Sequence, residues 1–136
     1  MCGLGAATAV GAVLGSRFVS VRPELPIERL PPTFAEWGGT QIGVVDEEGR
    51  LVGKVWRDDF APQRSPGRVA GDRMSRALYV LEGQPVTRAV EAAVREHSRV
   101  IFVVNTDRVL VGTLSDLDLL RWVTRERRQQ ALRSGA

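Results

Sequence analysis

The chain has very little of the side-chain chemistry on which metal sites and many catalytic sites depend. It contains one cysteine (Cys2), one histidine (His97) and one lysine (Lys54). A single cysteine excludes an intramolecular disulfide, and one cysteine with one histidine supplies too few ligands for a structural zinc site. Because disulfides are rare in reducing compartments, the sequence predicts a cytoplasmic protein without a metal site.

The first fifteen residues contain no charged side chain, and glycines interrupt them at positions 3, 5, 11 and 15. A membrane-spanning helix needs about 20 apolar residues, and a secretory signal begins with a basic region. Residues 1–15 meet neither requirement, so we expect no membrane association. We expect instead a small-residue segment, helical around Ala6 to Leu14, that packs closely on the rest of the fold.

The overall composition is that of an ordinary globular protein. The 136 residues are 43% hydrophobic and 26% charged, which suits one domain or two very small ones. Lysine and arginine together number 19 against 16 acidic residues, a net charge of +3. This modest excess permits anionic ligands without requiring nucleic acid.

An internal repeat is the most informative feature of the sequence. Shifting the chain against itself by 59 positions aligns residues 18–59 with residues 77–118 without a gap. The identical aligned pairs are Val21/Val80, Pro26/Pro85, Arg29/Arg88, Ile42/Ile101, Val44/Val103, Val45/Val104, Leu51/Leu110, Val52/Val111, Gly53/Gly112 and Asp59/Asp118. Composition alone would not also retain proline, glycine and aspartate in one register, so we interpret the two segments as structural repeats.

Both repeats show the same order of secondary-structure signals. The β-rich runs are 18–21, 41–45 and 51–56 in the first repeat and 78–81, 100–104 and 109–114 in the second. Apolar side chains at helical spacing occupy Ile27–Ala35 and Val86–Val94. Because Pro31 and Pro32 interrupt the first of these, we expect that helix to start near Pro32. A last helix is expected from Ser115 to about Gln130.

The two β-α-β-β-α units resemble a tandem pair of cystathionine-β-synthase (CBS) domains, also called a Bateman module. The resemblance covers about residues 16–126 and rests on Val44–Gly53, Val69–Ser75, Val103–Asn105 and Val109–Leu120. It implies an α+β fold in which two CBS-type repeats pack as a pseudo-two-fold pair. The expected organisation is an N-terminal segment at 1–15, repeats at 16–60 and 69–127, a Pro- and Arg-rich linker at 61–68 and a basic tail at 128–136.

The resemblance implies a regulatory module that binds an adenosine nucleotide, such as AMP, ADP, ATP or S-adenosylmethionine, and has no cofactor. The family's motif of Gly, then Ser or Thr, then Asp at three-residue intervals is matched by Gly112, Ser115 and Asp118. At a helix start, Ser115 would lie among free backbone N–H groups that attract phosphate. The Asp118 oxygens suit ribose hydroxyls, and Gly112 lets backbone and ligand come close.

The same residues have a purely structural interpretation. Ser-x-x-Asp at a helix start is nearly a capping box, in which Ser115 satisfies a backbone N–H and Asp118 favours the helix dipole. In the first repeat Gly53 and Asp59 keep the motif, but Trp56 replaces the hydroxyl residue. At this possible second site the indole is large enough to fill the phosphate position. Alternatively, Trp56 covers the sheet edge or stacks on a ligand base.

We find no catalytic constellation, because His97 has no nucleophile or second histidine at a known triad spacing. Arg121, Arg125 and Arg128 form a basic stripe that Glu126 interrupts, which is typical of a solvated helix face or of a charge source for a bound polyphosphate. We therefore expect no enzyme and no specific nucleic-acid binding. The expected partners are a second copy of the chain, forming a homodimer, and an unidentified regulated protein. The alternative function is a CBS-type dimerisation or protein-interaction module that has lost its ligand.

Overall fold

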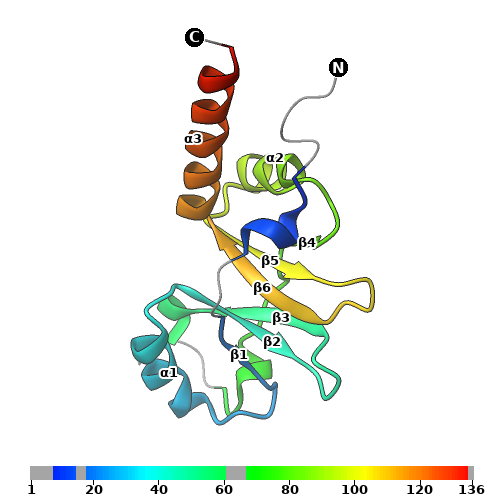
Figure 1. The fold of residues 1–136 in the computed structure, drawn as a ribbon. Helices are drawn as coiled ribbons and strands as arrows, with labels where there is room; N and C mark the ends of the chain where they lie inside the picture. Colours follow the sequence, from blue (N-terminus) through cyan, green and yellow to red (C-terminus); the bar gives the residue numbers. More distant parts are fainter. Residues whose placement is uncertain (1–7, 15–17, 61–66, 135–136) are drawn as a thin grey trace. The chain divides into compact units, whose positions relative to one another are not determined.

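The computed structural model describes residues 8–14, 18–60 and 67–134, and only the backbone of residues 59 and 60. These residues form an α+β fold with two three-stranded sheets (Figure 1). They divide into two compact units, one built mainly from the first repeat and the other mainly from the second. The predicted α+β fold class is confirmed: both repeats have the order β-α-β-β, but the closing helix of the predicted β-α-β-β-α unit forms only in the second repeat, and a 3-10 turn (Arg57–Phe60) takes its place in the first.

The first unit contains the sheet β1-β2-β3 and the helix α1 (Leu30–Trp37). β1 (Ser20–Val21) pairs in parallel with β2 (Gln41–Val45), which pairs antiparallel with β3 (Leu51–Trp56). The buried cluster that joins helix and sheet comprises Val21, Leu30, Phe34, Ile42, Val44, Val55 and Ala70. β2 and β3 begin and end where the sequence predicts.

The start of α1 differs from the sequence expectation by two residues. α1 begins at Leu30 rather than near Pro32, and Ile27–Arg29 form a separate short 3-10 turn. Pro31 and Pro32 lie in the first turn of α1, where backbone N–H groups have no acceptor within the helix. The prolines therefore cost the helix no hydrogen bond there, although they do prevent one continuous helix from Ile27.

The second unit contains the sheet β4-β5-β6 and two helices. β4 (Tyr79–Leu81) pairs in parallel with β5 (Val100–Val104), and β5 neighbours β6 (Leu110–Ser115). The helix α2 (Val86–Glu96) packs on β5 and on the helix α3 (Asp116–Arg133) (Figure 1). The buried cluster comprises Val10, Val80, Val86, Ala89, Ala92, Ile101, Val103, Leu114, Leu119 and Trp122. α3 extends into the expected basic tail because residues 128–133 contain no glycine or proline.

Two left-handed backbone positions recur in both repeats. α1 ends at Gly38 with a φ of 80°, and α2 ends at the aligned His97 with a φ of 52°. In the turns between paired strands, Gly49 has a φ of 83° and the aligned Arg108 a φ of 67°. Glycine adopts this conformation without the steric penalty that a side chain meets. The repeat therefore keeps its backbone path even where the second copy lacks glycine.

Each compact unit is completed by a segment that precedes the other repeat in the chain. Residues 68–75 pack on the first repeat, where Gly71 N–H donates to the Pro23 carbonyl at 2.9 Å. Residues 8–14 pack on the second repeat, where Gly11 N–H donates to the Glu82 carbonyl at 2.8 Å. Pro23 and Glu82 are aligned positions of the repeat. The two segments are therefore structurally equivalent. The segment that precedes the first repeat packs on the second repeat, and the segment that precedes the second repeat packs on the first.

These exchanged segments fill the cores. Ala70 opens a 3-10 turn (Ala70–Asp72) and Val10 opens another (Val10–Val13), and both side chains are fully buried. The compact units thus differ from the boundaries expected from sequence, because residues 69–77 group with the first repeat. Of the helix expected around Ala6 to Leu14, only the 3-10 turn forms within residues 8–14, and residues 1–7 lie outside the described part.

Candidate functional site at the start of α3

Ser115 and Asp118 satisfy each other's hydrogen bonds at the start of α3. The Ser115 hydroxyl accepts from Asp118 N–H at 3.1 Å, and Asp118 Oδ2 accepts from Ser115 N–H at 2.9 Å and from the Ser115 hydroxyl at 3.0 Å. This is a complete capping box, the structural interpretation that the sequence left open. It fixes both side chains at the end of β6.

The backbone N–H groups of the first turn are not free, although the sequence led us to expect free donors there. Asp116 N–H donates to the Arg99 carbonyl at 2.9 Å, and Leu117 N–H donates to Asp116 Oδ1 at 2.9 Å. Asp118 N–H is bonded to Ser115 as described. These three N–H groups already donate to a carbonyl, a carboxylate and a hydroxyl of the chain. A phosphate at this helix start would have to displace these acceptors.

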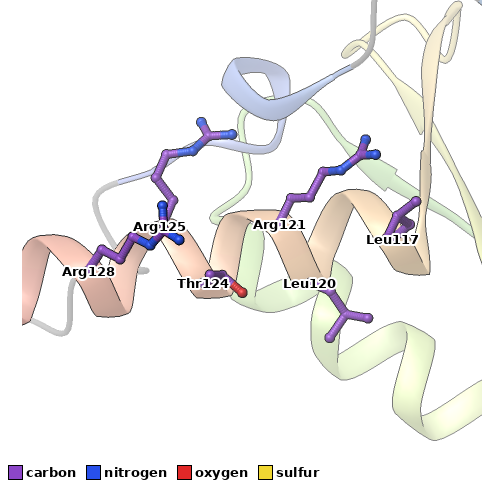
Figure 2. Close-up of a pocket in the computed structure, with 6 residues that line it drawn as sticks. All are labelled: Leu117, Leu120, Arg121, Thr124, Arg125 and Arg128. Atoms are coloured by element: carbon purple, nitrogen blue, oxygen red, sulfur yellow. The ribbon is translucent and has the colours of Figure 1, made fainter.

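One oxygen of Asp118 lies outside the capping box. Asp118 Oδ1 is 4.0 Å from Arg121 Nη1, and the Asp118 side chain is 31% exposed. Arg121 also lines a shallow hollow along α3, together with Leu117, Leu120, Thr124, Arg125 and Arg128 (Figure 2). The basic stripe expected from the sequence therefore starts beside Asp118 and continues along the helix.

The motif glycines are covered by protein atoms. A Cβ built on Gly112 would lie 3.1 Å from both methyl carbons of Leu14, and one built on Gly53 would lie 3.0 Å from Met74 Sδ and from the Ser75 carbonyl oxygen. Both glycines are buried. Their lack of a side chain therefore accommodates the exchanged segments, a role that the sequence did not suggest.

The motif in the first repeat differs from that in the second. Trp56 ends β3 with 37% of its surface exposed, so the indole is only partly covered. Asp59 follows in a 3-10 turn (Arg57–Phe60), and its side chain lies outside the described part of the chain. The structure therefore places Gly53 and Trp56 in β3 without bringing a hydroxyl to the position of Ser115.

Comparison with known proteins identifies the fold. Residues 69–125 match the family model of the CBS domain. The structure of CBSX2, a protein of Arabidopsis thaliana, in complex with AMP is similar to that of this chain, with a TM-score of 0.79. The two sequences are 22% identical, and the structural alignment covers 89% of this chain and 99% of CBSX2. The second repeat thus matches the CBS domain family, and the chain has the fold of a tandem CBS domain pair.

Other structures similar to this CBS pair come from bacteria. The CBS domains of a transcriptional regulator from Streptococcus pneumoniae are 17% identical, with a TM-score of 0.75 over 85% of this chain and 98% of that chain. The CBS domain of a bacterial CNNM/CorC family Mg²⁺ transporter in complex with ATP is 16% identical, with a TM-score of 0.74 over 88% of this chain and 89% of that chain. No curated protein sequence matches the chain significantly.

The sequence analysis did not predict that two polar side chains, Lys54 and Gln41, would be buried. Lys54, in β3, is 9% exposed, and its ammonium nitrogen lies 4.4 Å from the centre of the Trp56 ring. Burial lowers the pKa of the Lys54 ammonium. Gln41, in β2, is 3% exposed, and among the described residues neither polar atom of its amide has a hydrogen-bond partner. The signal that could have indicated their burial is that each lies in an otherwise mostly apolar β-rich run, Gln41 in residues 41–45 and Lys54 in residues 51–56.

Among the described residues, the other chemically active side chains form no site. His97 is the left-handed cap at the end of α2, which explains its position without a functional role. Asp58 is 84% exposed and pairs with Arg57 at 3.5 Å. Within the described ranges, no three histidine, cysteine, aspartate or glutamate residues gather closely enough to hold a metal ion. No helix among the described residues combines the length and apolar character needed to cross a membrane.

Proposed function

We propose that this CBS pair is a regulatory module that binds an adenosine nucleotide at the start of α3. The observation that carries the proposal is the position of Asp118, a partly exposed carboxylate whose Oδ1 is left over from the capping box and adjoins Arg121. Carboxylate oxygens accept hydrogen bonds from the paired hydroxyls of a ribose. Arg121 supplies a guanidinium, whose planar donors suit a phosphate.

This arrangement modifies the ligand contacts that the motif implied. Because the first-turn N–H groups are already bonded, Arg121 rather than the helix start holds the phosphate in our proposal. The similar structures support the ligand class, since CBSX2 was solved with AMP and the CNNM/CorC domain with ATP. The candidates for this chain are AMP, ADP, ATP and S-adenosylmethionine.

Regulation follows if the ligand binds one arrangement of the module more tightly than another. Occupancy then shifts the population toward the tighter-binding arrangement, and a regulated protein that contacts the module senses the change. The shift is limited by the difference in affinity between the two arrangements, so a weakly discriminating ligand would produce a weak signal.

A second candidate function, dimerisation or protein interaction, is favoured by exposed apolar side chains in the second unit. Val94 at the end of α2 is 69% exposed, and Leu117 and Leu120 on α3 are 50% and 62% exposed. Such side chains are typical of helix faces that bind a partner. We propose that they contribute to a homodimer, which light scattering at micromolar concentrations would detect.

The experiment that tests nucleotide binding is a melting assay with the four adenosine compounds. A ligand that binds only the native state should stabilise it by about 2.7 kcal/mol at 100 times its dissociation constant. Asp118→Ala should weaken binding about ten- to a hundredfold, because it removes a hydrogen bond to a charged acceptor. Calorimetry on the wild type and the variant measures this loss directly.

Asp59→Ala is the matched control, because it removes the aligned aspartate of the first repeat, where Trp56 replaces the hydroxyl residue. We expect it to change the affinity little. Ser115→Ala and Asp118→Ala both break the capping box, so each also lowers the free energy of unfolding by about 1 kcal/mol, and the affinity measured by calorimetry on folded protein isolates the ligand contact. A larger loss from Asp59→Ala than from Asp118→Ala would contradict the assignment, and no stabilisation by any compound would favour the interaction module.

A further inference from the structure

The last turns of α3 extend beyond the core of the second unit. Trp122 is the last buried residue of the helix, and every residue of 124–133 except Glu126 is exposed. At 1.5 Å per residue, this part of the helix is about 15 Å long. It forms the orange-to-red end of α3, which passes beyond α2 (Figure 1). We call residues 124–133 the projecting half of α3.

The described chain provides no packing for the projecting half. Its one large apolar side chain, Leu132, is 82% exposed, the highest value for a large apolar residue among those described. Most of the stability of a helix in a folded protein comes from packing of one face, and short helices without packing are marginal in water. An ordered helix with an unpacked leucine therefore indicates that a partner covers this part of the molecule.

The charge of the projecting half specifies an acidic partner. Four arginines lie in it, at positions 125, 127, 128 and 133, against the single acidic residue Glu126. Within the part of the chain that the structure describes, no carboxylate forms an ion pair with any of the four. The projecting half of a second copy would bring arginines against arginines, and like charges across an interface oppose binding. Carboxylates are the complementary groups.

Arg125, Arg128 and Leu132 lie on one face of α3, because they follow one another at intervals of three and four residues. We call these three residues the α3 basic face. Arg125 and Arg128 also line the far end of the hollow of about 420 Å³ along α3, where the Arg121 and Arg125 side chains rise from one edge (Figure 2). Arg133, five residues after Arg128, lies on a different side of the helix.

A leucine among arginines favours a protein over nucleic acid or a membrane as the partner. A nucleic-acid backbone would pair with the guanidinium groups but leave Leu132 uncovered. A helix that lies in a membrane surface has a broad apolar face, often with aromatic residues, whereas Trp122, the only aromatic residue of α3, is buried. A protein segment supplies both carboxylates, which match the planar guanidinium, and an aliphatic side chain.

We propose that the α3 basic face is a docking surface for an acidic amphipathic segment of a partner protein. Carboxylates of the segment pair with Arg125 and Arg128, and an apolar side chain of the segment packs on Leu132. The face includes neither Asp118 nor the residues assigned to the homodimer, so this proposal is independent of nucleotide binding and of dimerisation.

Fluorescence anisotropy with a labelled peptide tests the proposal on the full chain. The probe is a peptide of about 18 residues with leucine and glutamate on one helical face, and its control carries glutamine in place of every glutamate. We expect the acidic peptide to bind at least about tenfold more tightly than the control. We also expect its binding to weaken as the salt concentration rises from about 0.05 to 0.5 M, because salt screens exposed charges.

Variants of exposed residues locate the bound peptide. Arg125→Gln and Arg128→Gln should each weaken binding of the acidic peptide about two- to fivefold, as expected for exposed ion pairs. Leu132→Ala should weaken it about five- to tenfold, because less apolar surface is buried. Arg133→Gln removes the same charge from the same helix outside the basic face, and as the matched control it should leave the affinity unchanged. All four side chains are exposed, so the melting temperature should stay that of the wild type.

Several results would overturn the proposal. Equal binding of the acidic and glutamine peptides would show that charge does not select the partner, and an equal loss in Arg133→Gln would show an effect of net charge alone. Duplex DNA or phosphatidylserine vesicles that bind more tightly than the peptide, and lose binding in Arg128→Gln, would assign the face to nucleic acid or a membrane. Light scattering that shows a dimer in the wild type and a monomer in Arg128→Gln would assign it to a second copy.

Discussion

The two repeats share a backbone and differ in the chemistry placed on it. Ile42 and Val44 in the first repeat match Ile101 and Val103 in the second, and all four are buried. On the neighbouring strands β3 and β6, Lys54 and Trp56 of the first repeat align with Thr113 and Ser115 of the second. The comparison shows that the core face is retained because packing constrains it, whereas the other face carries different polar side chains in the two copies.

The largest effects that we expect are at two aligned, fully buried core positions. Leu114→Ala in β6 should lower the free energy of unfolding by about 2–5 kcal/mol. Val55→Ala in β3 removes one carbon fewer and should cost less by about 0.8 kcal/mol. Urea unfolding of both variants checks the order. A greater loss for Val55→Ala would show that the first core is the more tightly packed.

A smaller effect is expected at the motif glycines. Gly53→Ala should lower the free energy of unfolding by about 1–3 kcal/mol, because the new Cβ meets the Ser75 carbonyl at 3.0 Å. That carbonyl is fixed by the paired backbone hydrogen bonds between Ser75 and Lys54, at 2.8 and 2.9 Å. Gly112→Ala should cost less, because Leu14 methyl groups can rotate away. Calorimetric melting of the two variants would contradict this if Gly112→Ala were the more damaging.

The smallest effects are expected at the helix ends. Gly38→Ala should lower the free energy of unfolding by about 1 kcal/mol, because alanine resists a φ of 80° and no atom lies near enough to compensate. His97→Gly should raise it by less than about 1 kcal/mol, since the greater freedom of unfolded glycine offsets part of the relief. Denaturant titrations measure both, and a loss in His97→Gly would show that the imidazole stabilises the cap.

The fold was largely predictable, and the sites were predictable only in part. β2, β3 and β5 match their expected ranges, and α2 begins at the expected Val86 and ends two residues beyond Val94, because apolar periodicity and turn residues are local signals. The capping box of Ser115 and Asp118 is also local and was visible as an alternative. The bonded state of the first-turn N–H groups was not, since one acceptor, the Arg99 carbonyl, belongs to a distant part of the chain.

The sequence by itself determined the repeat, the order of its elements and the residues of the family's motif. These follow from spacing along the chain, which the 59-residue alignment reveals directly. Only the tertiary structure decided that residues 8–14 complete the second repeat and residues 68–75 the first, that Leu14 and Met74 cover the motif glycines, and that Gln41 and Lys54 are buried. Burial and pairing depend on contacts between segments far apart in sequence, and no local pattern carries that information.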